Sequence, residues 1–300
     1  MTIRRSTVLA IGASGRSAGL IVPELARRGV SVRAFLRDVG KANAVRTNGA
    51  TDIVIGDLRD PESLRTAMEG IDGVFYIGPL FAEDEMALGL RTVEVAEQAG
   101  VRRFAFSSVM HPAAPLTHHA AKLPVETALQ GSRLAYTILQ PAVFFQNFEP
   151  NWPLIIQNAC ISAPYSRDVT IGLVDYRDVA EVAAIALTDD RLACGSFELC
   201  AEQALDRHTI AKIMGEESGL TVVAAEQTPQ QWLETTVFPG TDREKGLLAK
   251  MFAHYDLHGF AGNYFTLTTI LGREPRRLRN YIGELEMKRR QATSVSSPPN

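Results

Sequence analysis

The chain has 300 residues, of which 46% are hydrophobic, a content that is ordinary for a globular protein with a substantial core. Its formal net charge of −3 excludes a global attraction to nucleic acid or to an anionic membrane, and any anion site must therefore be local. The three cysteines, Cys160, Cys194 and Cys200, form no CxxC pair, which favours reduced thiols over a disulfide framework or a metal site.

No apolar run in the chain reaches the roughly 18 residues that a bilayer-spanning helix needs. The first apolar segment is too short for a signal peptide and leads directly into a glycine turn. We therefore expect a cytoplasmic protein without a membrane, nucleic-acid or metal partner. A homodimer is compatible with these features.

Strand and helix patterns alternate through the first half of the chain. The predicted strands are Thr7–Ile11, Ser31–Leu36, Asp52–Ile55, Gly73–Ile77, Arg103–Ser107 and Ala135–Leu139. Helices are predicted between them, near residues 20–26, 39–47, 61–69, 85–99 and 125–130. Apolar strands that alternate with helices predict an α/β fold with a doubly wound parallel sheet.

From Pro141 onward the alternation is less regular. We expect residues 171–190 to return to the sheet as a strand and a helix. The short strands near Ser196–Leu199 and Thr221–Val223 are assigned to a smaller, mostly helical lobe. The predicted division is a sheet domain over 1–150, a smaller lobe over 151–170 and 191–288, and a disordered tail over 289–300.

The glycine turn after the first strand is the most informative motif. Gly12, Gly15 and Ala18 stand three residues apart between the strand that ends at Ile11 and a predicted helix. Together with the next strand they form a unit of about 30 residues that is typical of a Rossmann dinucleotide site, where backbone N–H groups face a pyrophosphate. The turn also contains Ser14, Arg16 and Ser17. The Ser17 hydroxyl could bind a phosphate oxygen or cap the helix.

Arg37 directly follows the second strand, where NAD-binding folds usually carry a carboxylate. A guanidinium at this position suits the 2′-phosphate of NADPH, and Arg16 could complete a bidentate clamp. Lys41 could add a further positive charge. An ordinary turn followed by surface cations is the alternative. The complete strand–turn–helix–strand unit favours NADP(H) as the cofactor.

Three other predicted strands end in small or polar residues, at the edge where open α/β sheets bind ligands. The candidate cofactor contacts there are Asp57, Leu58, Gly78, Pro79 and Ser107. Val109 and His111 follow the last of these strands as candidate substrate contacts. Because Gly, Asp and Pro also form turns throughout proteins, plain turn chemistry is the alternative.

His118 and Lys122 are the candidates for chemistry, because on a helix their spacing of four residues places them on one face. Lys122 could hold a cofactor ribose and stabilise a developing negative charge, and His118 could supply a proton. Two features oppose this role for His118. Pro124 disfavours a helix that begins much before Lys122, and a nearby lysine disfavours the protonated imidazole. A solvated lysine and a surface histidine are the alternatives.

Aromatic side chains are frequent where a substrate would approach. The candidate substrate contacts among them are Phe81, Phe145, Phe148 and Trp152. As a group they favour a planar or apolar substrate over a sugar, although each could equally be a core residue. The other histidines form no recognisable metal pattern.

With these motifs the chain resembles the NmrA-like family of atypical short-chain dehydrogenases/reductases over residues 6–285. The turn Gly12-Ala13-Ser14-Gly15 resembles the family's GATG turn, with Ala18 in place of the third glycine, and Arg37 falls at its NADP-selecting arginine. The spacing from Lys122 through Glu126 to the strand that ends Gln140-Pro141 resembles a family pattern in which Gln140 is normally arginine. Pro141 and Phe144 join the candidate cofactor contacts on this basis.

The resemblance implies a Rossmann domain that binds NADP(H) and a smaller substrate lobe. It departs from most short-chain dehydrogenases at position 118, where their catalytic tyrosine is replaced by His118. Relatives with histidine there include reductases and NADPH-sensing regulators. We therefore expect an NADPH-dependent oxidoreductase acting on a small apolar, aromatic or conjugated acceptor (a quinone, imine, enone or carbonyl). The alternative is an NADPH-sensing regulator with little turnover.

Overall fold

The computed structural model describes residues 6–236, 238 and 240–295. The chain divides into two compact units. Unit 1 comprises Met1–Pro141 and Tyr176–Leu199, and unit 2 comprises Ala142–Asp175 and Cys200–Asn300. Each unit is therefore assembled from two separate stretches of the sequence.

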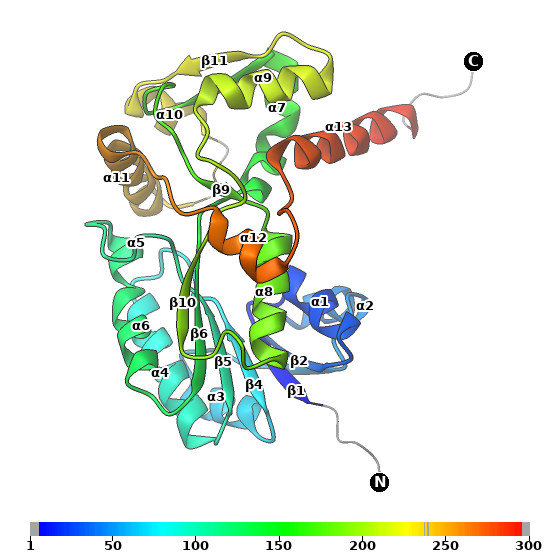
Figure 1. Cartoon of the computed structure of the whole chain (residues 1–300), viewed down its shortest axis with the longest axis vertical. Coiled ribbons are helices and arrows are strands. Elements are labelled where there is room, and N and C mark those ends of the chain that lie inside the picture. The colour runs from blue at the N-terminus through cyan, green and yellow to red at the C-terminus, as the bar shows by residue number, and fades with distance from the viewer. Residues whose placement is uncertain (1–5, 237, 239, 296–300) are drawn as a thin grey trace. The chain divides into compact units, whose positions relative to one another are not determined.

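Unit 1 is built on a seven-stranded parallel sheet (Figure 1). Its strands are β1 (Thr7–Ile11), β2 (Ser31–Leu36), β3 (Asp52–Ile55), β4 (Gly73–Tyr76), β5 (Arg103–Ser107), β6 (Ala135–Pro141) and β10 (Gly195–Leu199). Their order across the sheet is β3-β2-β1-β4-β5-β6-β10, and every neighbouring pair is parallel. The predicted doubly wound fold is confirmed, with the reversal of strand order between β1 and β4, where such sheets bind ligands.

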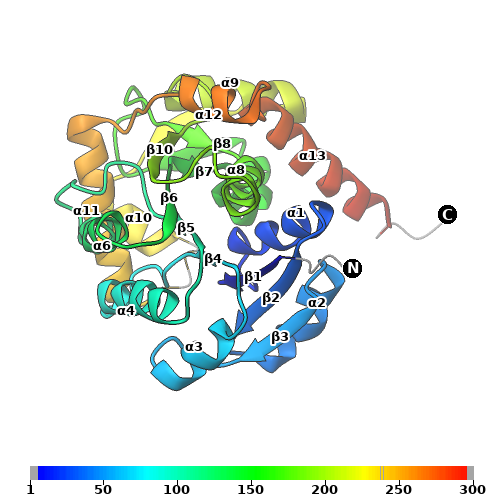
Figure 2. The same cartoon turned by 60° about the horizontal axis from the view of Figure 1, so that its bottom comes forward.

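Helices cover both faces of this sheet (Figure 2). On one face, α1 (Ile21–Arg27) packs against α8 (Tyr176–Thr188), which also contacts β4, β5 and β6. On the other face, α4 (Glu85–Gln98) packs between α3 (Pro61–Met68) and α6 (Leu123–Gln130). The remaining helices of unit 1 are α2 (Ala42–Thr47) and the short α5 (Thr117–Ala120).

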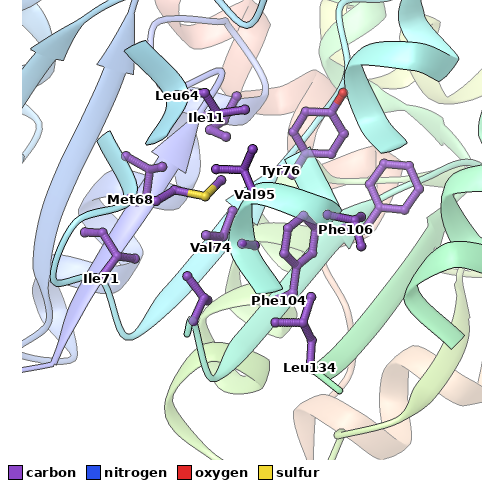
Figure 3. Close-up of a cluster of buried hydrophobic side chains, with 14 of the residues drawn as sticks. Ile11, Leu64, Met68, Ile71, Val74, Tyr76, Val95, Phe104, Phe106 and Leu134 are labelled. Atoms are coloured by element: carbon purple, nitrogen blue, oxygen red, sulfur yellow. The ribbon is translucent and has the colours of Figure 1, made fainter. Parts of the chain in front are cut away.

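A cluster of buried apolar side chains lies between the sheet and the layer of α3, α4 and α6 (Figure 3). Leu64 and Met68 of α3 and Phe104 of β5 are each at most 1% exposed. Tyr76 belongs to the same cluster, and its ring stacks on Phe106 at a centroid distance of 5.6 Å. Figure 3 shows the Tyr76 hydroxyl directed away from the apolar side chains. This packing holds α4 and α6 against the sheet and thereby positions the residues at their N-termini.

Two predictions about the second half of the chain are wrong. Strand β10, which was assigned to the smaller lobe, is the seventh strand of the main sheet and pairs with β6. The strand predicted within 171–190 does not return to that sheet. It is reduced to β9 (Leu173–Val174), which pairs with β7 (Val143–Phe144) inside unit 2. Only α8 packs on the sheet as expected.

Unit 2 is mostly helical, with two short parallel strand pairs. Besides β7 and β9, strand β8 (Cys160–Ala163) pairs with β11 (Val223–Glu226). Its helices are α7 (Trp152–Asn158), α9 (Arg207–Ser218), α10 (Pro229–Thr235), α11 (Asp242–His258), α12 (Phe265–Leu271) and α13 (Leu278–Val295). Arg207 of α9 ties that helix to β11 and to the segment after β8, because its guanidinium donates to the carbonyls of Ala225 and Tyr165.

The predicted disordered tail over 289–300 is wrong for its first part, since α13 continues to Val295. Residues 296–300 lie outside the described part of the chain. Glu286, inside α13, accepts hydrogen bonds from Arg289 and Arg290 one turn later, and these ion pairs support the helix beyond residue 288. Among the described helices, none is both long and apolar enough to cross a lipid bilayer.

Candidate functional site

The turn after β1 has the geometry that its glycines predict. Gly12 has a φ of +88°, and a Cβ added to it would lie 2.7 Å from Cγ2 of Ile77. The N–H of Gly15 donates to the carbonyl of Gly12 at 2.8 Å, which closes a tight turn. Ser14, Gly15 and Arg16 are exposed at its tip. The backbone of this turn is therefore accessible to a ligand, and position 12 requires glycine.

Gly19 is a residue of this turn that the sequence analysis missed. A short 3₁₀ segment, Ala18–Leu20, precedes α1, and the N–H of Gly19 donates to the carbonyl of Gly15. A Cβ at Gly19 would approach the carbonyl oxygen of Ala13 to 2.9 Å. The close approach of turn and helix thus occurs at Gly19, one residue beyond the expected position. The buried Ala18 packs against Gly12.

Several polar side chains around the turn make no hydrogen bond or ion pair within the part of the chain that the structure describes. Within residues 6–236, 238 and 240–295, no hydrogen bond joins the hydroxyl of Ser14 or Ser17 to another group, and Ser17 does not cap the helix. Over the same ranges, no ion pair involves the three exposed cations predicted to recognise phosphate, which are Arg16, Arg37 and Lys41. Arg37 directly follows β2, and the register pairs Phe35 of β2 with Ile11 of β1.

This edge of the sheet fits a phosphorylated dinucleotide. It combines a glycine turn that a side chain would obstruct, exposed backbone and two unused hydroxyls. Exposed cations flank the turn on a chain whose net charge is −3. The residues that could hold the cofactor at this end are Gly12, Ser14, Gly15, Arg16, Ser17, Arg37 and Lys41.

Asp57 and Leu58, the candidates after β3, have structural roles. The Asp57 carboxylate accepts the N–H of Arg59 at 2.9 Å, which is the turn chemistry that the alternative interpretation describes. Leu58 packs against the buried apolar cluster. Both are half-buried at the correct edge of the sheet. Contact with a cofactor stays a prediction for each of them.

Ser107 is engaged inside unit 1. It is fully buried, and its hydroxyl accepts a hydrogen bond from Tyr176 at 2.9 Å. This bond ties the end of β5 to the start of α8, so the Ser107 hydroxyl is directed into the protein. Pro141 at the end of β6 is also buried, and its carbonyl accepts the N–H of Met110. Val109, two residues after Ser107, is half-buried.

Lys122 lies at the centre of a buried polar cluster that follows β4 and β5. The residue is 7% exposed and is the N-cap of α6. Its ammonium donates to Oε1 of Glu85 at 2.5 Å and to the backbone carbonyl of His118 at 2.9 Å. Lys122 is therefore a buried, paired cation rather than the solvated lysine of the alternative interpretation.

Glu85, the partner of Lys122, is a second residue that the sequence analysis missed. It is the first residue of α4 and is 4% exposed. A Cβ at Gly78 would lie 3.2 Å from its Cγ and Oε1, so the glycine predicted as a cofactor contact also makes room for Glu85. Burial raises the pKa of Glu85, and the Lys122 ammonium opposes that shift. Glu85 is one of several acidic residues near the start of α4, so nothing in the sequence marked it for this role.

The predicted proton donation by His118 conflicts with its surroundings. The imidazole is 6% exposed and packs edge-on against Phe81 at 5.1 Å and against His119 at 4.6 Å. Burial, followed by His119 and Lys122, lowers the pKa of His118 to about 3. A neutral imidazole has no spare proton to supply near pH 7. The spacing of four residues does join His118 to Lys122, through the backbone carbonyl and not the ring.

A second buried carboxylate anchors α6 to the sheet. Glu126 accepts hydrogen bonds from the Ser108 hydroxyl and, at 2.9 Å, from the amide of Gln140. Burial raises the pKa of Glu126, and its bonds to Ser108 and Gln140 oppose the shift. The residue that the family pattern would make arginine is thus a neutral partner of this carboxylate. Lys122, one turn before Glu126, is held in place by this anchor.

Of the candidate substrate contacts, three lie in unit 1. Phe81 is buried beside His118, with a positive φ of 66°. His111 is exposed, and its carbonyl oxygen lies 3.1 Å from Nδ1 of His119. The third candidate substrate contact in unit 1 is the half-buried Val109.

The aromatic candidates Phe144, Phe145, Phe148 and Trp152 belong to unit 2. Phe145 is fully buried against Tyr281, and Trp152 is 3% exposed, so both serve the core of that unit. Phe144 and Phe148 are half-buried. Contacts of these four with cofactor or substrate stay predictions.

The model of the NmrA-like family matches residues 4–285 of the chain. Among curated proteins, the NAD(P)H azoreductase of Xenophilus azovorans is 27% identical over 217 residues, which are 72% of this chain and 75% of that protein.

Solved structures with the same fold include the triphenylmethane reductase of a Citrobacter species. It superposes with a TM-score of 0.83 at 20% identity and covers 94% of this chain and 99% of its own. NmrA, a negative transcriptional regulator solved with NAD, superposes with a TM-score of 0.80 at 17% identity, covering 97% and 98%. Enzymes and a regulator therefore share this fold.

The buried ion pair predicts how replacement of Lys122 affects stability. Lys122→Met leaves the Glu85 carboxylate buried without a countercharge, and we expect a loss of about 3–5 kcal/mol in the free energy of urea unfolding. Since the isolated carboxyl has a raised pKa when folded, the loss should be larger at pH 8 than at pH 5. Lys122→Met combined with Glu85→Gln should recover most of the loss. A double variant as unstable as the single one would contradict this account.

The lowered pKa of His118 predicts a pH dependence of stability. The unfolded chain binds a proton at this histidine near pH 6.5, whereas the folded chain stays neutral there down to about pH 3. Stability should therefore decline as the pH falls below 6.5, by at most about 1.4 kcal/mol per pH unit from this residue. His118→Leu should flatten the decline in urea titrations between pH 7 and pH 4.5. The matched change His208→Leu at an exposed position should not, and equal slopes for both variants would refute the assignment.

Proposed function

This chain belongs to the NmrA-like family, and we propose that it is an NADPH-dependent reductase of small, apolar, conjugated acceptors. The observation that carries the proposal is a glycine turn flanked by exposed cations after β1 and β2, together with a buried lysine in the segment that follows β5 of the same sheet. The named activities of the azoreductase and the triphenylmethane reductase support the acceptor class. Quinones, imines, enones and carbonyl compounds belong to the same chemical range.

The cofactor end of the proposed site is formed by the turn after β1 and by Arg37. Backbone N–H groups of the turn and the Ser14 and Ser17 hydroxyls would bind the pyrophosphate, with Ala18 packed beneath. Arg37, with Arg16 and Lys41, would bind the 2′-phosphate, since guanidinium matches the oxygens of a phosphate. Within unit 1, Asp57, Leu58, Gly78, Pro79, Ser107 and Pro141 complete the proposed cofactor contacts.

NADPH, when bound, supplies a hydride. Lys122 is the residue that we propose acts beside it, because two of its three N–H groups are used within unit 1 and one stays available. Its positive charge would orient the ribose or an acceptor and stabilise negative charge that develops on the acceptor. Within unit 1, the proposed contacts with the acceptor are Phe81, Val109 and His111.

The state of His118 limits the reactions that suit this site. With a pKa of about 3 its imidazole is neutral, so protonation of the product would rely on water or Lys122. A positioned acid contributes a factor of about 10²–10⁴ to a rate, which this site would lack. Strongly electrophilic, conjugated acceptors need such help least, and this favours them over simple ketones.

An NADPH-sensing regulator is the second candidate function. The absence of an acid at position 118 favours it, because a sensor needs cofactor binding without turnover. The likeness to NmrA keeps this alternative open at the level of the fold.

Turnover separates the two candidates. We expect the purified protein to oxidise NADPH in the presence of quinones, azo compounds, triphenylmethane dyes or enones, followed by absorbance at 340 nm. Lys122→Met combined with Glu85→Gln keeps the interior neutral and should abolish that turnover. Tight NADPH binding by calorimetry without turnover on any acceptor would favour the sensor. No binding at all would refute both functions.

Arg37→Asp tests the proposed cofactor preference. The substitution replaces a cation that would contact the 2′-phosphate by a carboxylate that suits a ribose hydroxyl, so affinity should shift from NADPH to NADH. A lost charge-assisted pair of this kind corresponds to about a tenfold or larger loss of NADPH affinity. Arg133→Asp, the same change beside the amino end of β6, is the control and should leave both affinities unchanged. Unchanged calorimetric titrations of Arg37→Asp would refute the assignment.

A further inference from the structure

The ammonium of Lys122 is held from two directions. Glu85 accepts one N–H from the start of α4, and the His118 carbonyl accepts another from α5. An ammonium has three N–H groups, so these two bonds fix the direction of the third. A long lysine side chain loses its usual freedom only when such contacts restrain it.

The position of Glu85 depends on the close approach of α4 and α6. A Cβ at Gly89 of α4 would lie only 2.5 Å from Cγ2 of Val125 on α6, so the two helices approach more closely than a side chain would allow. Gly78 leaves room for the carboxylate on the other side. Glu85 and Lys122 are thus brought together by two glycines on separate segments.

The second carboxylate oxygen of Glu85 has no hydrogen-bond partner within the described part of unit 1. The Phe81 backbone opposes the raised pKa of the Glu85 carboxyl by hydrogen bonding, and the Tyr76 hydroxyl is close enough for the Glu85 charge to raise its pKa. A buried carboxylate with an open lone-pair site is unfavourable for stability alone. Its position beside the proposed catalytic lysine points to a role in the site.

We propose that Glu85 is a positioning residue that holds Lys122 charged and directs its free N–H toward bound cofactor and acceptor. This inference rests on the proposed function. Glu85 itself touches neither ligand in this account, and it acts through Lys122. The other titratable groups that face the pair are His118 and His119 of α5 and Tyr76 of β4. His118 is neutral, and burial raises the pKa of Tyr76, so Glu85 supplies the negative charge.

Lysine-selective NMR of the protein without cofactor tests the electrostatic part. The chain has six lysines, so ¹³C-labelled lysine gives few signals, and that of Lys122 is assigned from the Lys122→Met/Glu85→Gln variant. In Glu85→Gln the Lys122 ammonium should lose its proton at a pH lower than in the parent protein by about one unit or more, as followed by its ¹³C signal. Glu85→Asp keeps the charge and should restore most of the difference. The matched control is Glu94→Gln, on the solvent face of α4. Identical titrations in parent and Glu85→Gln would overturn the proposal.

Kinetics test the positioning part. Glu85→Gln should lower kcat about 10- to 100-fold, as expected for a misplaced reacting group, with a smaller change in KM. The alkaline limb of kcat should move to lower pH together with the NMR titration. A fall in thermal stability with an unmoved pH profile would mean a structural ion pair and would overturn the proposal. If the parent protein turns over no acceptor, the proposed function fails, while the NMR titration still decides whether Glu85 controls the charge of Lys122.

Discussion

The buried contact between the Lys122 ammonium and the Glu85 carboxylate constrains the arrangement of unit 1. Removal of either charge from water is unfavourable, and the contact compensates only if both groups stay within hydrogen-bond reach. That requirement fixes the N-terminus of α4 relative to that of α6, and the glycines at 78 and 89 permit the approach. The Glu126 anchor on Ser108 and Gln140 then ties α6 to the ends of β5 and β6. The two buried charged contacts therefore determine how α4 and α6 are placed on the sheet.

The parallel sheet explains why residues so distant in sequence share one edge. In parallel strands all carboxyl ends lie on the same side, so the turn at Gly12, the arginine at 37 and the segments after β4 and β5 are brought to one edge. The exposed cations follow β1 and β2, whereas the buried ionic cluster follows β4 and β5. One end of this edge suits a phosphate, and the other has buried charges in fixed positions that suit a reacting group.

The sequence predicted those parts of the fold that depend on local pattern. Most strands of unit 1 begin and end within a residue or two of their expected limits, because buried parallel strands are short apolar runs bounded by turn residues. Strand β10 was misassigned because its pairing with β6 is a long-range property. For the same reason the partner of Lys122 was invisible, since Glu85 is one acidic residue among several. His118 had the expected spacing from Lys122, but its burial lowers its pKa and makes it a poor proton donor. Burial depends on the tertiary structure and cannot be predicted from a four-residue spacing.

The late position of α8 and β10 in the chain has a consequence for biosynthesis. When the ribosome has delivered the first six strands, one face of the sheet lacks α8 and β6 is still an open edge. Open edges and uncovered apolar faces are where nascent chains associate wrongly. Unit 1 can close only after a stretch of unit 2 has emerged and the chain has returned to it. A gene fragment cut near residue 150 would therefore yield an incomplete, aggregation-prone sheet rather than an independent nucleotide-binding module.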